Sequence, residues 1–290
     1  MAWSDEDHNK ETCCGQTRIM TDSKTSDLQT IMERPDPFEL DLPWGDYEFS
    51  RRFFDVVHDW GIPTEKEVSL IRDYVPSESA TLFDMACGGG RHALALASEG
   101  YAVTAMEIGR YPIELARRRA AEIKVEVDLI EGDIRGIEYR DRFDLAYLIC
   151  GQLGHLSPSD SREVFIRTGR ALKAGGYFMV HLFSFDSQQR ADYTNWYKEK
   201  RPFYFSHPAI VHREHYYLPT QRVRVIRDFA IDSVTRENRL FGISEKNYSQ
   251  VELEALASVA GLTLTDTFGS FDKVPLTEDS PDNIYIFRKP

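Results

Sequence analysis

The sequence predicts an α/β fold built around a parallel sheet, and two observations lead to this prediction. Between residues 80 and 184, short apolar runs alternate with segments of helical periodicity, which is the pattern of a parallel sheet with right-handed crossovers. A glycine-rich turn, "DMACGGG" at residues 84–90, joins the first of these strands to the first helix. The chain has 290 residues, 42% of them apolar, so it can bury a substantial core.

A tail and a helical region are expected to precede the sheet. Residues 1–36 are polar, charged and aperiodic, which predicts a disordered tail. Residues 37–76 form the next unit, in which apolar side chains recur at helical spacing. The pattern is interrupted at Gly61-Ile62-Pro63, so we expect two helices there. Residues 77–290 form the main domain.

Strands and helices alternate in the main domain until about residue 185. An insertion at about 185–247 breaks this rhythm: it is rich in aromatic residues and histidines, and residues 221–249 alternate like a hairpin. A helix that ends at Gly261, a strand and a last strand at 282–290 complete the chain. In the alternating part, strands are expected near 81–86, 102–107, 126–131, 143–150 and 176–184, and helices near 91–99, 111–122 and 160–173.

Charge and composition argue against several classes of partner. The net charge is −12, of which −7 falls in residues 1–46 (eleven acids against four Lys or Arg), and no basic stripe for nucleic acid is visible. No run of about 18 apolar residues predicts a membrane span, and the first residues lack the pattern of a secretion signal. The four cysteines suggest no disulfide framework, so we expect a cytoplasmic protein.

The glycine turn has two possible ligands. Gly88, Gly90 and Ala93 satisfy the loose dinucleotide pattern G-x-G-x-x-G/A, and Glu107 follows at the distance expected of a ribose-binding acid. An NAD(P)-dependent oxidoreductase is therefore one alternative. Asp84 argues against it, because a carboxylate at this turn would repel a pyrophosphate but would attract an ammonium or a sulfonium.

A second acid supports the cation-bearing cofactor. Asp133 follows the third strand, where its carboxylate can accept from an adenine amino group while Ile134 packs on the ring. Asp133 has an alternative role as a turn or N-cap residue, because "GDIRG" is a good turn by itself.

Three motifs carry a specific resemblance. They are "DMACGGGRHALALASEGYAVTAMEIG", "IEGDIRGIEYRDRFDLAYLICGQLGHL" and "ALKAGGYFMVHLF", in this order. Over about residues 45–290 the chain resembles a class I S-adenosylmethionine-dependent methyltransferase of the small-molecule type. The family's first motif is usually D-x-G-C-G-x-G, and Ala86 replaces a glycine. The resemblance implies a Rossmann-like, doubly wound, mostly parallel seven-stranded sheet with an antiparallel last strand, an N-terminal helical lid and a substrate-cap insertion.

The resemblance also implies which residues bind S-adenosyl-L-methionine. Tyr47 and Arg51 would belong to the lid, although both could be ordinary helix surface. Arg91 and His92 could be the first exposed turn of a helix, and Cys87 and Cys150 could be small packing residues. The complete set of implied cofactor contacts is Tyr47, Arg51, Asp84, Ala86, Gly88, Gly90, Glu107, Ile108, Asp133, Ile134, Ile149 and Cys150.

The acceptor residues are expected after the fourth strand and in the cap. An amine acceptor must be neutral and a hydroxyl acceptor usually needs a base, for which His155 is the candidate. Arg213 could clamp a substrate carboxylate, and aromatic faces could hold a cationic amine or the sulfonium. His212-x-x-His215 alone is a weak metal motif, so no metal is expected. The predicted catalytic residues are His155 and Tyr217, and the predicted substrate contacts are His155, Trp196, Arg213 and Tyr216.

These residues predict a methyltransferase that acts on a small metabolite, of the kind found in bacterial secondary metabolism. N-methylation is slightly favoured over O-methylation, because no clear base–acid pair is visible. The alternatives are an S-adenosylmethionine-binding enzyme repurposed for other chemistry, such as cyclisation, and more distantly the NAD(P) enzyme. We expect a small-molecule acceptor as partner, neither nucleic acid nor membrane, and a monomer or homodimer.

Overall fold

A computed structural model describes residues 36–39, 43–57, 64–185 and 190–290. The tail predicted for residues 1–36 therefore lies outside the described residues except for Asp36, and so does the helix break predicted at 61–63. Within the described ranges, the search for helices long and apolar enough to cross a membrane found none.

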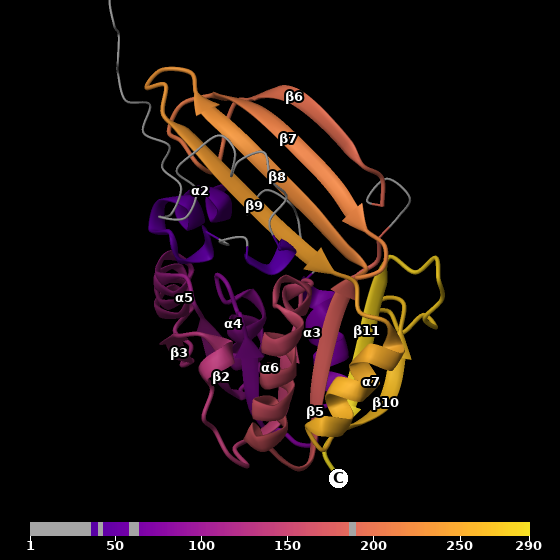
Figure 1. Ribbon diagram of the computed structural model, residues 1–290. Coiled ribbons are helices and arrows are strands. Elements are labelled where there is room, and N and C mark those ends of the chain that lie inside the picture. Colours follow the sequence, from indigo (N-terminus) through magenta and orange to yellow (C-terminus); the bar gives the residue numbers. More distant parts are fainter. Residues whose placement is uncertain (1–35, 40–42, 58–63, 186–189) are drawn as a thin grey trace, which may run out of the picture.

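The main domain contains a seven-stranded sheet of order β10-β11-β5-β4-β1-β2-β3 (Figure 1). Neighbouring strands from β5 to β3 pair in parallel, whereas β11 runs antiparallel to both β5 and β10. The predicted mostly parallel sheet with an antiparallel last strand is confirmed. The strands are β1 (Thr81–Met85), β2 (Ala102–Glu107), β3 (Asp128–Glu131), β4 (Phe143–Leu148), β5 (Leu172–Phe183), β10 (Thr263–Phe268) and β11 (Asp282–Arg288).

Helices cover both faces of this sheet. Alternate side chains of each strand point to opposite faces, so Leu82 packs with α3, α4 and α5, while its neighbour Phe83 packs with α6 and α7. This arrangement is the predicted doubly wound architecture. The helices are α3 (Thr64–Asp73), α4 (Arg91–Ser98), α5 (Arg110–Ile123), α6 (Pro158–Ala171) and α7 (Gln250–Val259), with short 3₁₀ turns η4 (Ile134–Gly136) and η5 (Gln152–His155).

The insertion forms a second sheet, of order β6-β7-β8-β9. Its strands are β6 (Tyr193–Glu199), β7 (Ala209–Leu218), β8 (Val223–Asp232) and β9 (Asn238–Lys246), all antiparallel. The predicted hairpin corresponds to β8 and β9, and the structure adds β6 and β7 to it. This cap sheet lies over the end of the main domain where the parallel strands finish (Figure 1).

Helix α2 (Tyr47–Val57) connects the cap sheet to the main domain. The helix begins after Asp46, whose carboxylate accepts from the Phe49 backbone N–H at 2.7 Å. The buried Phe49 ring packs between Phe203, Tyr204 and Phe241 of the cap. Two 3₁₀ turns, η1 (Pro37–Glu39) and η2 (Pro43–Gly45), precede α2.

Candidate active site

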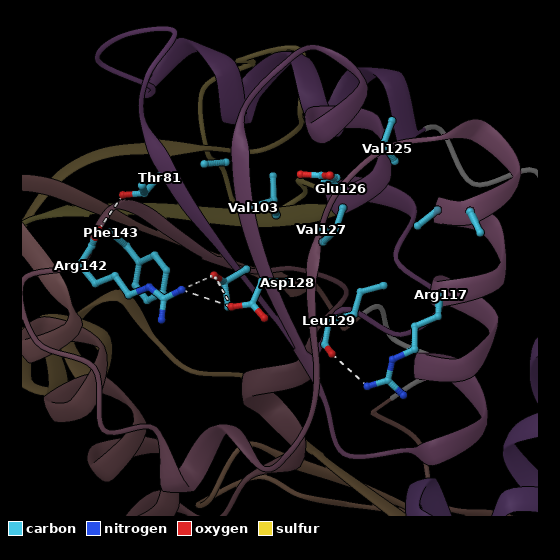
Figure 2. A pocket seen from close by; sticks show the side chains of 14 residues that line it. Thr81, Val103, Arg117, Val125, Glu126, Val127, Asp128, Leu129, Arg142 and Phe143 are labelled. Atoms are coloured by element: carbon cyan, nitrogen blue, oxygen red, sulfur yellow. Dashed lines mark hydrogen bonds and ion pairs between the residues drawn. The ribbon is translucent and has the colours of Figure 1, made fainter.

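A surface groove of about 720 Å³ lies at the amino-terminal starts of β1 to β4, beside α5 (Figure 2). Its polar groups bind one another: Arg142 donates to Thr104 at 3.1 Å and to Asp128 at 3.2 Å, and Arg117 donates to the Leu129 carbonyl at 3.0 Å. In open α/β sheets, ligands bind outside the carboxyl ends of the strands instead. We therefore place the candidate site at the other edge, under the cap sheet.

The turn between β1 and α4 is shaped to bring the backbone close to a ligand. Ala86, Gly88 and Gly90 have φ angles of 55°, 54° and 78°, in the left-handed region that glycine adopts most easily. A Cβ on Gly90 would lie 2.9 Å from the Ala116 Cβ, so a side chain does not fit there. Ala86 occupies a conformation that favours glycine, which agrees with the glycine usual at this motif position.

Asp84 is buried directly beneath this turn. Its carboxylate accepts from the Ala93 backbone N–H at 3.2 Å, at the start of α4. Burial raises its pKa to about 7, although the nearby Arg91 guanidinium and Tyr147 hydroxyl lower it. An acid so far from water gains from a cationic ligand, because the ligand charge would favour the ionised carboxylate.

Glu107, at the end of β2, accepts hydrogen bonds from the loop after β1 and from the loop after β2. Its Oε2 accepts from the Gly88 backbone N–H and its Oε1 from that of Gly109, both at 2.9 Å. Burial raises its pKa, while these backbone N–H groups lower it. Glu107 is therefore a buried acid at the turn and not a solvated residue at the end of a strand.

Asp133 is engaged with its neighbour on the chain. It caps η4 by accepting from the Arg135 backbone N–H at 2.8 Å, and it pairs with the Arg135 guanidinium at 2.6 Å. Burial alone would raise its pKa, but the Arg135 hydrogen bonds leave it below its ordinary value. Asp133 therefore has the N-cap role that was the alternative, and an adenine amino group would have to share its carboxylate with Arg135. Ile134 is buried beside it, whereas Ile108, after β2, is exposed.

The chain after β4 forms a tight loop beneath the cap. Ile149 is buried, and Cys150 has a φ of 65° and donates its backbone N–H to His181 Nδ1 at 3.1 Å. The His181 Nε2 therefore carries the proton that is shared with Asp282 at 3.0 Å. His181 is therefore a hydrogen-bonded histidine of the core.

His155 lies at the end of η5, in the same loop, and is half-buried. Its Nδ1 is 2.8 Å from the Ser244 carbonyl oxygen of β9. Because a carbonyl only accepts, Nδ1 must donate, and the neutral ring then has an unprotonated Nε2. This tautomer suits a general base.

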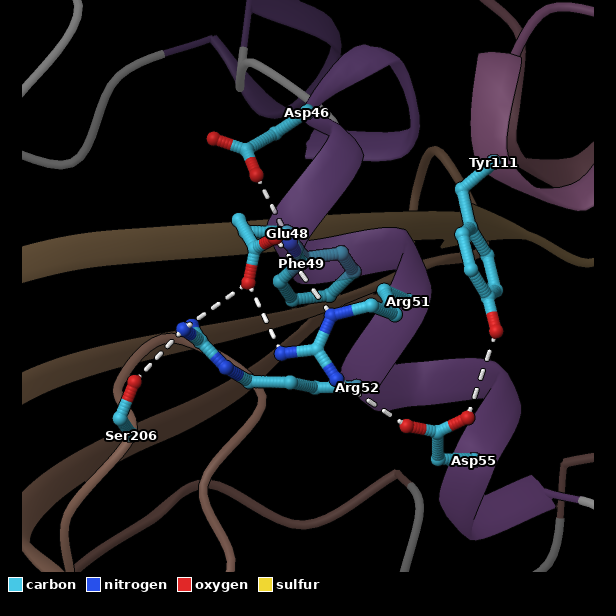
Figure 3. Close-up of polar contacts among 8 residues, drawn as sticks. All are labelled: Asp46, Glu48, Phe49, Arg51, Arg52, Asp55, Tyr111 and Ser206. Atoms are coloured by element: carbon cyan, nitrogen blue, oxygen red, sulfur yellow. Dashed lines mark hydrogen bonds and ion pairs between the residues drawn. The ribbon is translucent and has the colours of Figure 1, made fainter.

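Helix α2 is held by polar contacts on several sides (Figure 3). The Tyr47 hydroxyl donates to Glu114 of α5 at 3.0 Å. Arg51 pairs within the helix, with Glu48 at 2.9 Å and with Asp55 at 3.3 Å. Both predicted lid residues therefore have protein partners on α2 and α5.

The aromatic face of α2 reaches the glycine turn. A Cβ on Gly88 would lie 3.1 Å from the Phe54 ring. Arg52 of the same helix donates to Ser206 of the cap at 3.0 Å (Figure 3). One helix thus contacts the turn on one side and the cap on the other.

Comparison with known proteins agrees with this geometry. Residues 82–176, from β1 into β5, match the family model of a methyltransferase domain. This match supports, over residues 82–176, the resemblance to the class I S-adenosylmethionine-dependent methyltransferases.

Similar proteins come from several biosynthetic settings. The chain is 28% identical over 138 residues to a dTDP-4-amino-2,3,4,6-tetradeoxy-D-glucose N,N-dimethyltransferase of Saccharopolyspora spinosa, covering 46% of this chain and 53% of that one. It is 30% identical over 137 residues to a ubiquinone biosynthesis O-methyltransferase of Vibrio atlanticus, covering 45% and 56%. The chain therefore spans about half the length of these curated relatives.

A solved structure extends the likeness to the cap. The CcbJ methyltransferase from Streptomyces caelestis superposes with a TM-score of 0.66 at 19% identity, covering 86% of this chain and 98% of that one. At this identity the likeness concerns the fold alone.

The residues at the turn fit the family's cofactor, S-adenosyl-L-methionine. A buried acid beneath a glycine turn is suited to a cationic amino acid group, and a second buried acid lies at the end of β2. The individual contacts of Tyr47, Arg51, Asp84, Ala86, Gly88, Gly90, Glu107, Ile108, Asp133, Ile134, Ile149 and Cys150 with the cofactor stay predictions.

The cap separates the predicted acceptor residues into two sets. Arg213 and Tyr217 lie on the face turned to the main domain, as does Glu245, whose Oε1 would be 3.3 Å from a Cβ on Gly151. Arg213 is already paired with the buried Asp228 at 2.6 Å. A substrate carboxylate would have to compete with this internal partner.

Trp196 and Tyr216 lie on the opposite, outer face of the cap sheet. Side chains alternate along a strand, so Tyr216 points away from the side taken by Tyr217, and Trp196 packs its ring on His212 of that same outer face. Trp196 is 64% exposed and Tyr216 is buried with Val223. Neither residue lies on the cap face that is turned to the main domain, and their contact with the substrate stays a prediction.

Sequence analysis missed Glu67, which is buried on α3. It pairs with Arg91, and its Oε2 is 3.0 Å from His92 Nε2. Arg91 also donates to Cys150 Sγ at 3.1 Å. His92 is buried and Arg91 is largely covered, so the alternative of an exposed first helix turn is wrong. A signal was available, because Glu67 shares a helical face with Leu70 and Ile71.

The structure offers no support for a metal at the histidine pair. His212 and His215 are three residues apart on β7 and therefore point to opposite faces. Across the described ranges, no group of three or more His, Cys, Asp or Glu could hold a metal ion.

Proposed function

We propose that this protein transfers the methyl group of S-adenosyl-L-methionine to a small-molecule acceptor, with nitrogen favoured over oxygen as the accepting atom. The observation that carries the proposal is the proximity of two features along one sheet edge. Buried Asp84 and Glu107 lie at the cofactor turn, and His155 follows the neighbouring strand β4 under a separate cap sheet.

The acceptor class is supported by the relatives and by the cap. One relative is named for an amino sugar nucleotide and another for ubiquinone biosynthesis, so both act on biosynthetic intermediates. The cap of this chain is a single four-stranded sheet over the strand ends, suited to enclosing a small molecule. On this basis we propose a role in biosynthetic, secondary metabolism, and a cytoplasmic location stays an expectation from the cysteine pattern.

The cofactor supplies a methyl group that is already activated by its sulfonium. The protein has to hold the acceptor in line with it and exclude water. The acceptor lone pair forms the bond to the methyl carbon, the carbon–sulfur bond breaks, and its electron pair stays on sulfur. His155 Nε2 takes the proton that the acceptor loses, and the Ser244 carbonyl holds the ring by its Nδ1–H.

The first experiment is calorimetric titration with S-adenosylhomocysteine, with NAD and NADP as controls. Micromolar binding of S-adenosylhomocysteine alone is expected, because Asp84 attracts a cation and repels a pyrophosphate. Binding of a nicotinamide nucleotide instead would establish the oxidoreductase alternative. Rapid release of methylthioadenosine without any acceptor would favour cyclisation chemistry over methyl transfer.

His155→Asn tests the base. The asparagine amide can replace Nδ1–H at the Ser244 carbonyl but has no counterpart of Nε2. Turnover should fall about 100-fold, the usual scale of general base catalysis, with cofactor affinity nearly unchanged. The matched control is His207→Asn, at a cap histidine 3.1 Å from Asp232, which should leave turnover unchanged. Equal turnover of His155→Asn and wild type would make His155 structural.

A further inference from the structure

One buried carboxylate of the cap lies directly over the loop that follows β4. Glu245, on β9, is 6% exposed, and its Oε1 would lie 3.3 Å from a Cβ placed on Gly151. Its Cγ would lie 3.1 Å from a Cβ on Gly154. The next residue after Gly154 is His155, so this acid and the proposed base border the same short loop.

Two glycines make this approach possible. Gly151 has a φ of 71°, and a Cβ there would lie 2.9 Å from the Phe183 ring. A Cβ on Gly154 would lie 2.9 Å from the Lys246 carbonyl oxygen. A side chain at Gly154 would push β9 and Glu245 away from the loop, whereas a side chain at Gly151 would first displace the Phe183 ring.

The two oxygens of Glu245 differ in their partners. Arg224, directly opposite on β8, donates to Oε2. Among the described residues, none donates a hydrogen bond to Oε1. Because Oε1 accepts from no described residue, it is available to a hydrogen-bond donor that a ligand brings.

Aromatic rings lie beside the guanidinium that pairs with Glu245. The Arg224 guanidinium lies over the Phe185 ring, 5.0 Å from its centroid. The Phe185 ring meets Tyr217 edge to face, with centroids 6.3 Å apart. The face of the cap that is turned to the main domain therefore offers one charged pair between aromatic rings.

We infer that Glu245 binds the methyl acceptor through its accepting amino group, and this inference rests on the proposed methyl transfer. Glu245 Oε1 and His155 Nε2 are both hydrogen-bond acceptors, and they border one loop. A neutral primary amine has two N–H groups, one for each of these acceptors, and keeps its lone pair for the methyl carbon, whereas a hydroxyl has a single hydrogen. The acceptor is a small primary amine.

Glu245→Gln separates the contact of Glu245 with Arg224 from its proposed contact with the amine. The amide oxygen can still accept from Arg224, so the pair across β8 and β9 is kept. The free Oε1 is replaced by an NH₂ group, which donates and therefore opposes an amine N–H. We expect the acceptor KM to rise at least tenfold, with the affinity for S-adenosylhomocysteine within twofold of wild type. The preference for an amine over its hydroxyl isostere should also be lost.

Glu214→Gln is the matched control, because Glu214 forms an interstrand pair with Arg227 at 3.1 Å on the outer face of the same sheet. The probes are small primary and secondary amines, including dTDP-4-amino-2,3,4,6-tetradeoxy-D-glucose, each paired with its hydroxyl isostere. Wild type and Glu214→Gln should methylate at least one primary amine of this panel with the same KM. An unchanged acceptor KM and preference in Glu245→Gln would overturn the assignment.

Two further outcomes distinguish this inference from the proposed function. Wild-type protein that binds S-adenosylhomocysteine but methylates only hydroxyl probes, or no probe at all, overturns the amine assignment and leaves the cofactor site standing. Wild-type protein that binds no S-adenosylhomocysteine overturns the proposed function itself.

Discussion

At the scale of single residues, the site combines two unfavourable features that a ligand would relieve. Asp84 is buried with a pKa raised to about 7, and Ala86 has a positive φ of 55° that costs an alanine about 1 kcal/mol. Both belong to the turn between β1 and α4. Residues held against their own preference cluster at functional sites, which supports this turn as the cofactor site.

Asp84→Asn should stabilise the folded protein and weaken the binding of the cofactor. Between about pH 4 and 7 the folded protein keeps a proton on Asp84 that the unfolded chain has released, so the contribution of Asp84 to the free energy of unfolding falls as pH rises through this interval. Asparagine does not titrate, so the free energy of unfolding of this variant does not fall for this reason as pH rises. Its melting temperature at pH 8 should exceed that of wild type, and the difference should disappear near pH 4.

The same variant should bind the cofactor less tightly. Loss of a charge-assisted hydrogen bond weakens binding by about 1–3 kcal/mol. Wild-type affinity should fall about tenfold per unit as pH drops below 7, because the ligand ammonium needs ionised Asp84, and the variant should not show this contribution. Calorimetry at pH 6 and pH 8 measures the affinity of each protein for the cofactor and its dependence on pH. Identical pH profiles for the two proteins would contradict the role of Asp84.

At the scale of elements, local pattern predicted what lies within one segment and missed what two distant segments build together. The alternation of strands and helices and the glycine turn are local, so the seven-stranded sheet and the position of Asp84 followed from them. Glu245 comes close to the loop after β4 only because β9 packs on that loop, and the local sequence around Glu245 does not predict this packing. The sides of Trp196 and Tyr216 depend on which face of the cap turns inward, and sequence alone does not specify that.

The contact of α3 with α4 shows the same limit and leads to a prediction. Glu67→Gln leaves the Arg91 guanidinium without its charge partner in a largely buried place. The free energy of unfolding should fall by about 3 kcal/mol, as expected when one member of a buried ion pair is removed. The exposed neighbour Glu65 supplies the control, because Glu65→Gln should change it by less than about 0.5 kcal/mol.

Acid denaturation gives an independent check on Glu67. Hydrogen bonds from His92 and Arg91 lower its pKa to about 2 despite the opposing effect of burial. Its stabilising contribution is therefore fully present above its ordinary pKa of 4.5 and is lost as pH falls toward 2. Wild type should lose stability relative to Glu67→Gln across that interval. Parallel stability curves for the two proteins would mean that Glu67 is not ionised in the fold.

At the scale of the whole molecule, two sheets meet at one edge and a single helix connects them. The cap contacts the loop after β4 through Glu245, and α2 contacts both the cap, through Phe49, and the glycine turn, through Phe54. Any ligand at the turn therefore changes the surroundings of α2 directly. The outer strand β6 pairs only with β7 among the described strands, and it reaches this contact through Tyr197, which packs in the cluster around Phe49.

Cofactor binding should accordingly protect α2 more than β6. At a free concentration of 100 times its Kd, S-adenosylhomocysteine raises the free energy of unfolding by about 2.7 kcal/mol, and hydrogen exchange shows where. Amides of α2 and of the turn at residues 88–90 should exchange more slowly with ligand. In Phe54→Ala the gain in α2 should shrink, because the ring that transmits it is gone, whereas Val251→Ala, at an exposed position of α7, should behave as wild type. Saturated protein with equal gains in α2 and β6, or with none in α2, would show that α2 is not a lid.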